Sequence, residues 1–488
     1  MRTGVFFFFL ALFAVTTAGH IYTIDGYLNY SVTKSMASRA AIEIPKFMMT
    51  VEGLGGRHYS KLGVGQSLVS LPFYGMGSLV ERIAPGNPLF RVYSGNFEFP
   101  HGDDLISAKP QTLIKTSDED GARVFFTALT NAVVAAGLCV LFWMLLRSFG
   151  ISSGLAFGGT LLLGFATPLW VYSRDLFAEP VFACCLVATF YLLREPGAVG
   201  EHRNLVFAGL ASSLGILARM SFAPIVVIFA VYLIFRSGNL RAGSRRALTY
   251  GLYCLPGIMI VAILNLTRFG GLTLTGYHTA FDKGFSAPLG RGLFWNLASS
   301  YRGILLYAPP VLLFVAGFAS FGRKYRAELV LIASIAIYVF VVYSKWWAWH
   351  GGWCWGPRFL LPIIPLLILP GIVVMSERPR WGIPLGILLG AVGFVVQLGA
   401  ILINYTAAYS YWIKIGRLDW AEVDIHKFSP VTTHLKAVLA TSPSDYDLWI
   451  VQACHTSGSR CVLILLPFVA MLVLATVRIV KHMKTAEA

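Results

Sequence analysis

Long apolar stretches recur along the whole chain, and they constrain its fold more than any other feature of the sequence. As helices of roughly 17 to 24 residues, they are long enough to cross a hydrocarbon core about 30 Å thick. Of the 488 residues, 56% are hydrophobic and only 13% are charged, which is about half the charged fraction of a soluble domain. The pattern predicts an all-α polytopic membrane protein with about twelve transmembrane helices.

One long and several short polar segments separate the predicted spans. A cleaved signal peptide is the alternative for the first span, because an apolar run that follows Arg2 and ends in small residues is typical of both. A retained helix is favoured here. The spans cover approximately residues 4–19, 124–146, 151–169, 179–193, 204–219, 221–235, 247–266, 304–321, 328–344, 358–375, 382–405 and 461–480.

Basic residues are concentrated in the short loops on one side of these spans, the side that carries both chain ends. Since short cytoplasmic loops are enriched in lysine and arginine, both termini are predicted to be cytoplasmic, in the inner or plasma membrane, with segment 20–123 outside. The same loops account for much of the formal charge of +16, so no nucleic-acid partner is expected. The chain has no Walker loop, dinucleotide fingerprint or zinc-ligand spacing, and we expect no cofactor and no metal.

The long outer segment 20–123 has several distinguishable parts. Apolar residues recur on one helical face of 28–40, which favours a helix that lies in the membrane interface. A glycine-rich turn at 52–56 predicts a short hairpin. Residues 64–83 are apolar but interrupted by a proline and three glycines, which is typical of a surface or partly re-entrant helix. Residues 85–120 are rich in proline and acids and are expected to form a flexible outer loop.

Two carboxylates stand at the outer ends of predicted spans and are candidates for catalysis. Asp25 follows the first span by a few residues, within Thr-Ile-Asp-Gly-Tyr, and Glu179 stands directly before Pro180 at the start of another span. Ionisable groups at membrane depth are functional candidates by default. Water solvates such groups at the interface, so Asp25 is alternatively a solvated loop acid and Glu179 a stabilising acid at a helix N-terminus.

Basic and aromatic residues collect near the same leaflet. Lys61 and Arg219 either neutralise a phosphate or extend toward lipid headgroups. Segment 345–358 reads KWWAWHGGWCWGPR and places His350 and Arg358 among five tryptophans. Tryptophans form belts at membrane interfaces, but sugars also stack on aromatic faces, which makes a saccharide site the functional alternative.

Three segments of the sequence together resemble a known family. They are YSKLGVGQSLVSLPFYG (59–75), YSRDLFAEP (172–180) and WWAWHGGWCWGPRFLLPIIP (346–365), and they follow a single span and a long outer loop opened by an aspartate. This order, over roughly residues 1–370, resembles the GT-C superfamily of integral-membrane glycosyltransferases, in particular bacterial proteins similar to protein O-mannosyltransferases and aminoarabinose transferases. The last two spans and 406–460 match the family poorly.

The resemblance implies a donor sugar on a polyprenyl phosphate and an acceptor hydroxyl of a lipid, glycan or protein outside the membrane. Asp25 occupies the position of the family's catalytic acid, although Gly26 stands where many members have a second acid. Glu179 matches an acid that the family often places before a proline. Lys61 stands where relatives have Lys-Pro-Pro, and here Leu-Gly follows it.

On this basis we predict an inverting single displacement. Asp25 would be the base that takes the acceptor proton, Glu179 would orient the acceptor or the sugar, and cations would stabilise the leaving phosphate. The residues expected at the donor phosphate are Lys61, Arg219 and Arg358, and those expected to bind substrate are Tyr27, Tyr59, Arg174, Asp175, His350 and Trp353.

Two other function classes stay open. One is a ligase or polymerase that moves whole saccharide chains. The other is a secondary transporter, which the number of spans suits, although such proteins usually show two similar halves and a site at the bilayer midplane. The predicted division of the chain is a GT-C-like module at 1–405, an outer cap at 406–460, and a last helix with a cytoplasmic tail at 461–488. Cys454 and Cys461 would form a disulfide if the outer side is oxidising.

Overall fold

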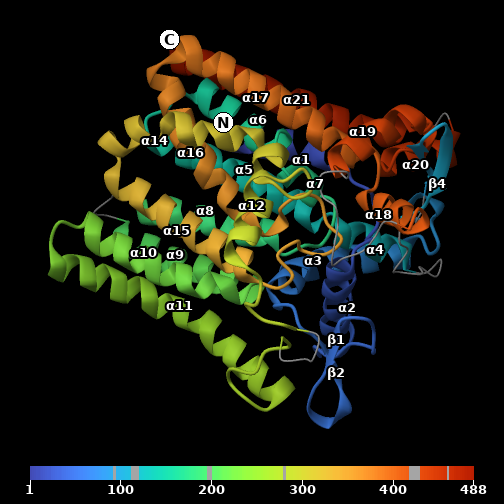
Figure 1. The fold of residues 1–488 in the computed structure, drawn as a ribbon, viewed down its shortest axis with the longest axis horizontal. Coiled ribbons are helices and arrows are strands. Elements are labelled where there is room, and N and C mark those ends of the chain that lie inside the picture. The colour runs from blue at the N-terminus through green and yellow to red at the C-terminus, as the bar shows by residue number, and fades with distance from the viewer. Residues whose placement is uncertain are drawn as a thin grey trace.

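Helices dominate the part of the chain that the computed structural model describes, residues 1–91, 95–110, 120–194, 200–277, 282–416, 429–458 and 461–487. The strands of this part form two separate hairpins. Six of its helical stretches are long and apolar enough to cross a membrane, and three shorter apolar helices accompany them. The expected all-α polytopic fold is thereby confirmed (Figure 1).

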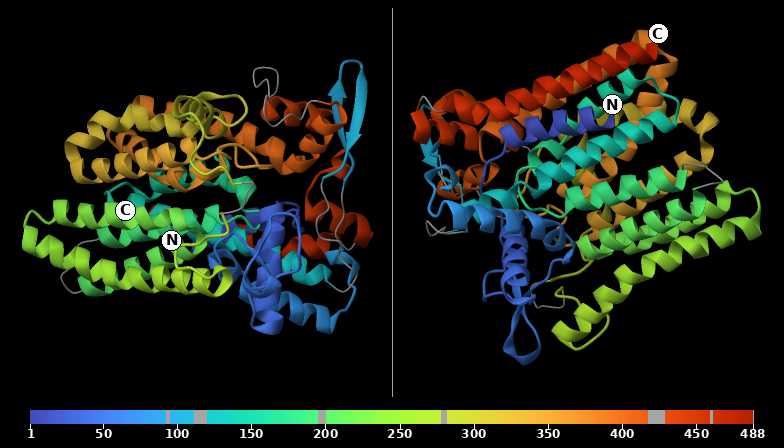
Figure 2. Two further views of the ribbon diagram at one scale, coloured as in Figure 1. Left: turned by 60° about the horizontal axis from the view of Figure 1, so that its bottom comes forward. Right: turned by 180° about the vertical axis from the view of Figure 1, so that it is seen from behind.

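Most helices lie side by side in one bundle (Figures 1 and 2). The predicted span 304–321 is interrupted, because Pro309 and Pro310 cannot donate backbone hydrogen bonds and end the helix there. The helices of the bundle are α1 (Arg2–Val15), α5 (Thr130–Ser148), α6 (Ser153–Phe165), α7 (Leu169–Tyr172), α8 (Glu179–Arg194), α9 (Glu201–Ala218), α10 (Ala223–Arg236), α11 (Leu240–Phe269), α12 (Leu289–Ala298), α13 (Ile304–Tyr307), α14 (Leu313–Lys324), α15 (Arg326–Lys345), α16 (Ile364–Glu377), α17 (Pro379–Leu402) and α21 (Cys461–Glu487).

The centre of the bundle is formed around α16 and the 3-10 turn η5 (Arg358–Ile363) that precedes it. Of an apolar run of 18 residues in this stretch, 94% is buried inside the protein. Close backbone contact requires a glycine at one place, since a Cβ on Gly317 of α14 would lie 2.4 Å from the carbonyl carbon of Pro370. By contrast, only 11% of an equally long apolar run of α21 is buried, so α21 lies at the lipid-facing edge.

The two chain ends lie at the same end of the bundle (Figure 1). Helices α1 and α21 are in contact, and a Cβ on Gly4 would lie 3.1 Å from the side chain of Ile479. The start of α1 therefore packs beside the last turns of α21.

The segment that follows α1 lies across the ends of the bundle helices. It contains α2 (Ile24–Arg39), the hairpin of β1 (Thr50–Glu52) and β2 (His58–Ser60), and α3 (Gly65–Ile83). Helix α2 runs across the direction of the bundle (Figure 1). The two predicted surface helices and the predicted hairpin are confirmed. Helix α2 begins earlier than expected, so Asp25 belongs to its first turn and not to a preceding loop.

The prediction of a flexible loop at 85–120 is wrong for part of its length. Strands β3 (Phe97–His101) and β4 (Asp104–Ala108) form a second antiparallel hairpin, which leads into α4 (Gly121–Ala128). The cause is alternation, because Phe97 and Phe99 are fully buried on one face of the hairpin. Phe99 stacks on Tyr411 at 4.8 Å between ring centroids.

The predicted cap at 406–460 begins with α18 (Tyr405–Lys414) and continues with α19 (Pro430–Ala440) and α20 (Trp449–Ser457). Helix α18 packs against β3 and β4, α19 packs against β3 and α17, and α20 packs against α21. Cys454 is disulfide-bonded, while the side chain of Cys461 lies outside the described residues, so the predicted pairing of these two cysteines is not tested.

Candidate active site

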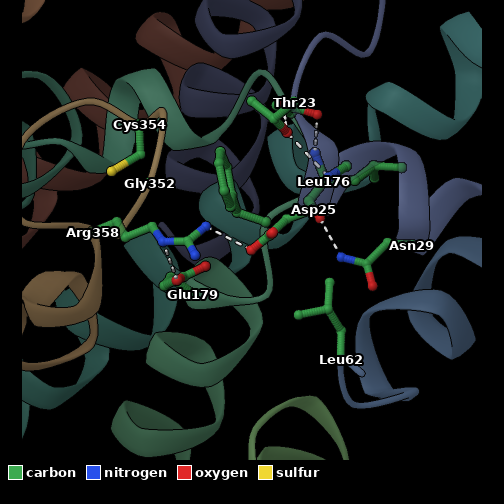
Figure 3. Close-up of polar contacts among 12 residues, drawn as sticks. Thr23, Asp25, Asn29, Leu62, Leu176, Glu179, Gly352, Cys354 and Arg358 are labelled. Carbon is green, nitrogen blue, oxygen red and sulfur yellow. Dashed lines mark hydrogen bonds and ion pairs between the residues drawn. The ribbon is translucent and has the colours of Figure 1, made fainter. Parts of the chain in front are cut away.

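Four charged residues from distant parts of the chain meet at one end of the bundle. We call Asp25, Glu179, Arg219 and Arg358 the acid–arginine cluster. Arg358 Nη1 donates to Asp25 Oδ2 at 2.6 Å (Figure 3). Glu179 Oε1 lies 3.0 Å from Arg219 Nη2 and 3.7 Å from Arg358 Nε. The two arginines and the two carboxylates thus form one continuous ionic group.

Each member of the cluster stands at a helix boundary. Asp25 is in the first turn of α2, and Glu179 is the first residue of α8. Arg219 directly follows α9, and Arg358 begins η5 after Pro357. Helix ends collect polar groups because their terminal backbone donors and acceptors lack partners within the helix. The cluster is therefore held by four separate elements.

Burial distinguishes Glu179 from the other three members of the cluster. The Glu179 side chain is 1% exposed, whereas those of Arg358, Arg219 and Asp25 are 11%, 15% and 19% exposed. Within the described part of the chain, neither carboxylate oxygen of Glu179 accepts a well-directed hydrogen bond. A buried carboxylate in this condition is costly unless it is paired and hydrogen-bonded. Glu179 therefore keeps unused hydrogen-bonding capacity beside two cations.

Aromatic rings surround the two guanidinium groups. The ring of Phe359 lies 4.8 Å from each guanidinium carbon, within the range of cation–π attraction. Tyr343 stacks on Phe359 at 4.5 Å, and its hydroxyl accepts a hydrogen bond from Arg219 Nη1 at 3.2 Å. Phe177 covers Arg358 from another side at 4.9 Å. These contacts fix the positions of the charges without neutralising them.

Lys61 lies next to this group but has its own partners. Its ammonium is 3.5 Å from Asp282 Oδ1 and 5.1 Å from the ring centroid of Tyr277. The loop that follows Lys61 lies directly on the end of α9. A Cβ on Gly63 would be 2.2 Å from the carbonyl oxygen of Leu217. The departure from Lys-Pro-Pro thus has a physical reason, because only glycine permits this approach beside Arg219.

Arg174 was expected to bind substrate, and the structure places it in a fully buried network. Its Nη1 donates to the backbone oxygens of Ala400 and Ile401 at 3.0 and 2.6 Å. Its Nη2 donates to Asp447 Oδ2 at 3.0 Å. His20 lies 3.0 Å from the same carboxylate. Burial alone would raise the pKa of Asp447, but His20 and Arg174 hold this pKa below its ordinary value.

Asp175 was also expected to bind substrate, and its carboxylate is 1% exposed. Thr23 Oγ1 donates to Asp175 Oδ2 at 2.5 Å, and the backbone nitrogen of Leu176 donates to Oδ1 at 2.7 Å. Burial raises the pKa of Asp175 to about 7, and the nearby charge of Asp25 contributes to the shift. Both carboxylate oxygens are therefore bonded within the protein.

The tryptophan-rich segment is held from inside by Arg302. The Arg302 guanidinium donates to the backbone oxygens of Cys354 and Gly352 at 2.5 and 2.8 Å. His350 Nδ1 accepts from the backbone nitrogen of Gly352 at 3.0 Å. Burial first, then the charges of Arg302 and Arg358, lower the pKa of His350 to about 3. His350 is therefore neutral at physiological pH.

The aromatic residues predicted to bind substrate are partly used in packing. Trp353 stacks on Tyr409 at 5.1 Å and an interplanar angle of 9°. The ring of Tyr27 contacts Phe47 at 4.3 Å. Tyr59 is buried in the hairpin and packs on α11. The structure thus brings Asp25, Glu179, Arg219 and Arg358 together, and distributes the remaining predicted residues around them.

Sequence reasoning did not identify several residues that contact the predicted ones. Thr23, Asp282 and Tyr343 each bond to a predicted site residue. Thr23 carries a usable signal, since a threonine directly before a helix is a preferred N-cap. Asp282 and Tyr343 have no local signal, because their roles depend on contacts across the bundle. Among the described residues, no group of three His, Cys, Asp or Glu side chains is arranged to hold a metal ion.

Comparisons with known proteins give a distant structural likeness. No protein-family model matches the chain, and no curated protein matches it in sequence. The structure is similar to ArnT from Cupriavidus metallidurans bound to undecaprenyl phosphate, with a TM-score of 0.49 and 14% identity over 94% of this chain and 76% of that chain. It is also similar to the apo oligosaccharyltransferase from Archaeoglobus fulgidus, with a TM-score of 0.41 and 12% identity over 88% of this chain and 55% of that chain.

With TM-scores below 0.5, neither match assigns an activity or a ligand to this chain. Functional assignment therefore depends on the chain's own residues.

Proposed function

We propose that the chain is an integral-membrane glycosyltransferase. It moves a sugar from a polyprenyl-phosphate donor to an acceptor hydroxyl on the outer face of the inner or plasma membrane. The observation that carries this proposal is the acid–arginine cluster. In it, a candidate base and two arginines converge with a buried acid that accepts no well-directed hydrogen bond from the described residues. The combination suits transfer from a phosphate leaving group, which needs cations more than a general acid.

Asp25 is the base in this proposal. The acceptor oxygen attacks the anomeric carbon while its proton passes to Asp25, and the bond from that carbon to the phosphate oxygen breaks with its electron pair on the phosphate. In the free enzyme Arg358 bonds to Asp25 at 2.6 Å. A donor phosphate competes for the same guanidinium, so donor binding releases a carboxylate oxygen for the acceptor proton. Attack from the side opposite the leaving group inverts the sugar configuration.

The remaining charges are assigned to the donor. Arg358 and Arg219 hold the phosphate, since a planar guanidinium binds phosphate oxygens in pairs. Lys61 joins them from the loop that packs on the end of α9. Glu179 stays beside both arginines and uses its free oxygen to accept a hydroxyl of the sugar or the acceptor. With Asp282 opposite Lys61, the three cations and three acids of the free site balance in charge.

The proposed orientation places the cluster outside and both termini in the cytoplasm, in an inner or plasma membrane. The contact between α1 and α21 supports a shared side for the two termini, because it brings both chain ends to one end of the bundle. We further propose residues 1–405 as the catalytic module and 406–460 as a cap over its outer end. A transporter is less well supported, since the charged cluster lies at helix ends and not at the middle of the spans.

The test supplies purified protein in liposomes with two donor classes, a polyprenyl-phosphate sugar and a sugar nucleotide. We expect transfer from the lipid-linked donor alone, and loss of transfer in Asp25→Asn. Asp103→Asn is the matched control, because Asp103 is an exposed acid in the same outer segment. Transfer from the sugar nucleotide with equal efficiency would overturn the donor assignment.

A further inference from the structure

Two acids from different parts of the chain lie at the first turn of α2. Asp25 belongs to that turn and bonds to Arg358 (Figure 3). Asp175 comes from the connection between α7 and α8 and bonds to Thr23, the residue that caps α2. Asp175 is 1% exposed with both oxygens bonded inside the protein, so it contacts no solvent-borne substrate.

Thr23 links the buried acid to the helix through a single hydroxyl. Its oxygen accepts from the backbone nitrogen of Gly26 at 3.1 Å, and its proton is donated to Asp175 Oδ2. A hydroxyl has one proton to donate, so this pairing fixes the direction of both bonds. The position of the first turn therefore depends on Asp175.

Gly26 leaves the space that the carboxylate of Asp175 occupies. A Cβ on Gly26 would lie 2.3 Å from Asp175 Oδ1 and 2.8 Å from Thr23 Oγ1. Any residue larger than glycine would displace the carboxylate from the cap. The second acid that the family resemblance places next to Asp25 is absent from the sequence there, and the carboxylate of Asp175 fills the space beside Gly26 instead.

The segment that carries Asp175 is itself fixed on two sides. Asn29 Nδ2 of α2 donates to the backbone oxygen of Leu176 at 2.7 Å. Asn131 Nδ2 of α5 donates to the backbone oxygen of Phe177 at 2.8 Å. The segment therefore joins α2 to the bundle and then continues into Glu179, the second acid of the cluster.

We propose that Asp175 is a positioning residue, which holds the first turn of α2 through Thr23 and so sets the direction in which Asp25 faces Arg358 and the acceptor. This assignment rests on the proposed function, because it takes Asp25 as the base. It differs from substrate binding by Asp175, since the carboxylate acts only through Thr23 and Gly26.

The kinetic test uses Asp175→Asn, Thr23→Val and the conservative Thr23→Ser. We expect the first two to lower kcat by about 10- to 100-fold, as misplacement of a catalytic group does. The KM for a polyprenyl-phosphate sugar should change less than about threefold, because the phosphate-binding cations are unaltered. Thr23→Ser keeps the hydroxyl and should restore most of the rate. The double variant Thr23→Val/Asp175→Asn should be no slower than either single variant, since both break one interaction.

Asp447→Asn is the control for general destabilisation. Asp447 is equally buried at the outer end but bonds to Arg174 and His20 and not to α2. Wild-type kcat in folded Thr23→Val, or an equal loss of kcat in Asp447→Asn, would overturn the assignment. A raised KM with unchanged kcat in Asp175→Asn would show that Asp175 binds substrate directly.

A second readout does not depend on the reaction. Deuterium exchange of peptides covering 23–30, which exclude His20, should accelerate in Asp175→Asn and Thr23→Val, and should be unchanged in Asp447→Asn. Unchanged exchange in the first two variants would overturn the positioning role whatever the enzyme transfers. Accelerated exchange in a protein that uses no polyprenyl-phosphate sugar would instead refute the proposed function and leave the positioning role standing.

Discussion

One end of the bundle contains two acid–arginine groups, which use the same residue types for different purposes. In the Arg174 network, the guanidinium donates to two backbone oxygens and to Asp447, which is also bonded by Asn404. In the acid–arginine cluster, the guanidinium groups meet aromatic faces and carboxylates, and Glu179 accepts no well-directed hydrogen bond from the described residues. The carboxylate of the first group, Asp447, is hydrogen-bonded to protein side chains, whereas that of Glu179 in the second group is not.

The difference indicates which group is built for a ligand. The hydrogen bonds to Asp447 from His20, Arg174 and Asn404 fix separate chain segments relative to one another and leave this carboxylate bonded without a ligand. A buried carboxylate that lacks hydrogen bonds is destabilising by itself, so its presence is better explained by a reaction than by stability. The two groups should therefore respond oppositely to substitution, one in stability and the other in activity.

The largest effect is expected from Arg174→Gln. This change leaves Asp447 buried with fewer partners, and breaking a buried pair destabilises by about 3–5 kcal/mol. Thermal melting of the purified protein in detergent should show a marked drop in Tm. Glu179→Gln, which removes the buried charge of the other group without leaving a buried ion unpaired, is the comparison variant and should melt near the wild type. Equal melting of both variants would remove the distinction between the two groups.

The next effect is expected from Arg358→Gln. Loss of this guanidinium removes a partner of Asp25 and a ligand of the leaving phosphate. We expect transfer to fall about 10²- to 10³-fold, the range seen when one stabilising donor is removed from an active site. Initial rates at saturating donor measure it. A variant that melts early but transfers normally would assign Arg358 to the structural group.

A smaller effect is expected from Glu179→Gln. Glutamine keeps the size and an acceptor oxygen but removes the charge beside Arg219 and Arg358. We expect about a tenfold loss of kcat/KM, since one hydrogen bond to a charged group is involved. Rates with a full donor and with donors lacking single hydroxyls separate sugar recognition from charge balance. Identical losses with every donor would mean that Glu179 serves only to pair the arginines.

The smallest effect concerns pH. The pKa of Asp175 is about 7 in the folded protein and 3.8 ordinarily, so between these values the folded state binds a proton that the unfolded state has lost. The free energy of unfolding then falls as pH rises through this window. His20 and Asp25 are the charged groups that face Asp175. Asp175→Asn lacks the titrating carboxyl group and therefore this pH-dependent stabilisation. The Tm difference between the variant and the wild type should be larger at pH 4.5 than at pH 7.5.

Much of the fold was predictable because its signals are local. The apolar runs gave the helices, and the glycine-rich turn gave the hairpin of β1 and β2. The β3–β4 hairpin was missed because two buried phenylalanines alternate within a segment dominated by proline and acids. A composition rule averages over such short alternation.

The candidate site was predictable in its charges but not in their division of labour. Asp25, Glu179, Arg219 and Arg358 were identified from residue type and membrane side, and the structure brings them together. Arg174 and Asp175 were assigned one role, yet they face different partners at Asp447 and Thr23. Those partners lie 273 and 152 positions away in the chain, and no spacing rule reaches so far.

The central claim is that Asp25 acts as a base at the acid–arginine cluster, and one measurement tests it most directly. Single-turnover transfer from a polyprenyl-phosphate sugar, with enzyme in excess, is compared for wild type, Asp25→Asn and Asp103→Asn, with donor binding measured in parallel. We predict that Asp25→Asn binds donor as the wild type does and transfers about 10²- to 10⁴-fold more slowly, while Asp103→Asn is unchanged. Wild-type transfer by a folded Asp25→Asn protein would contradict the account.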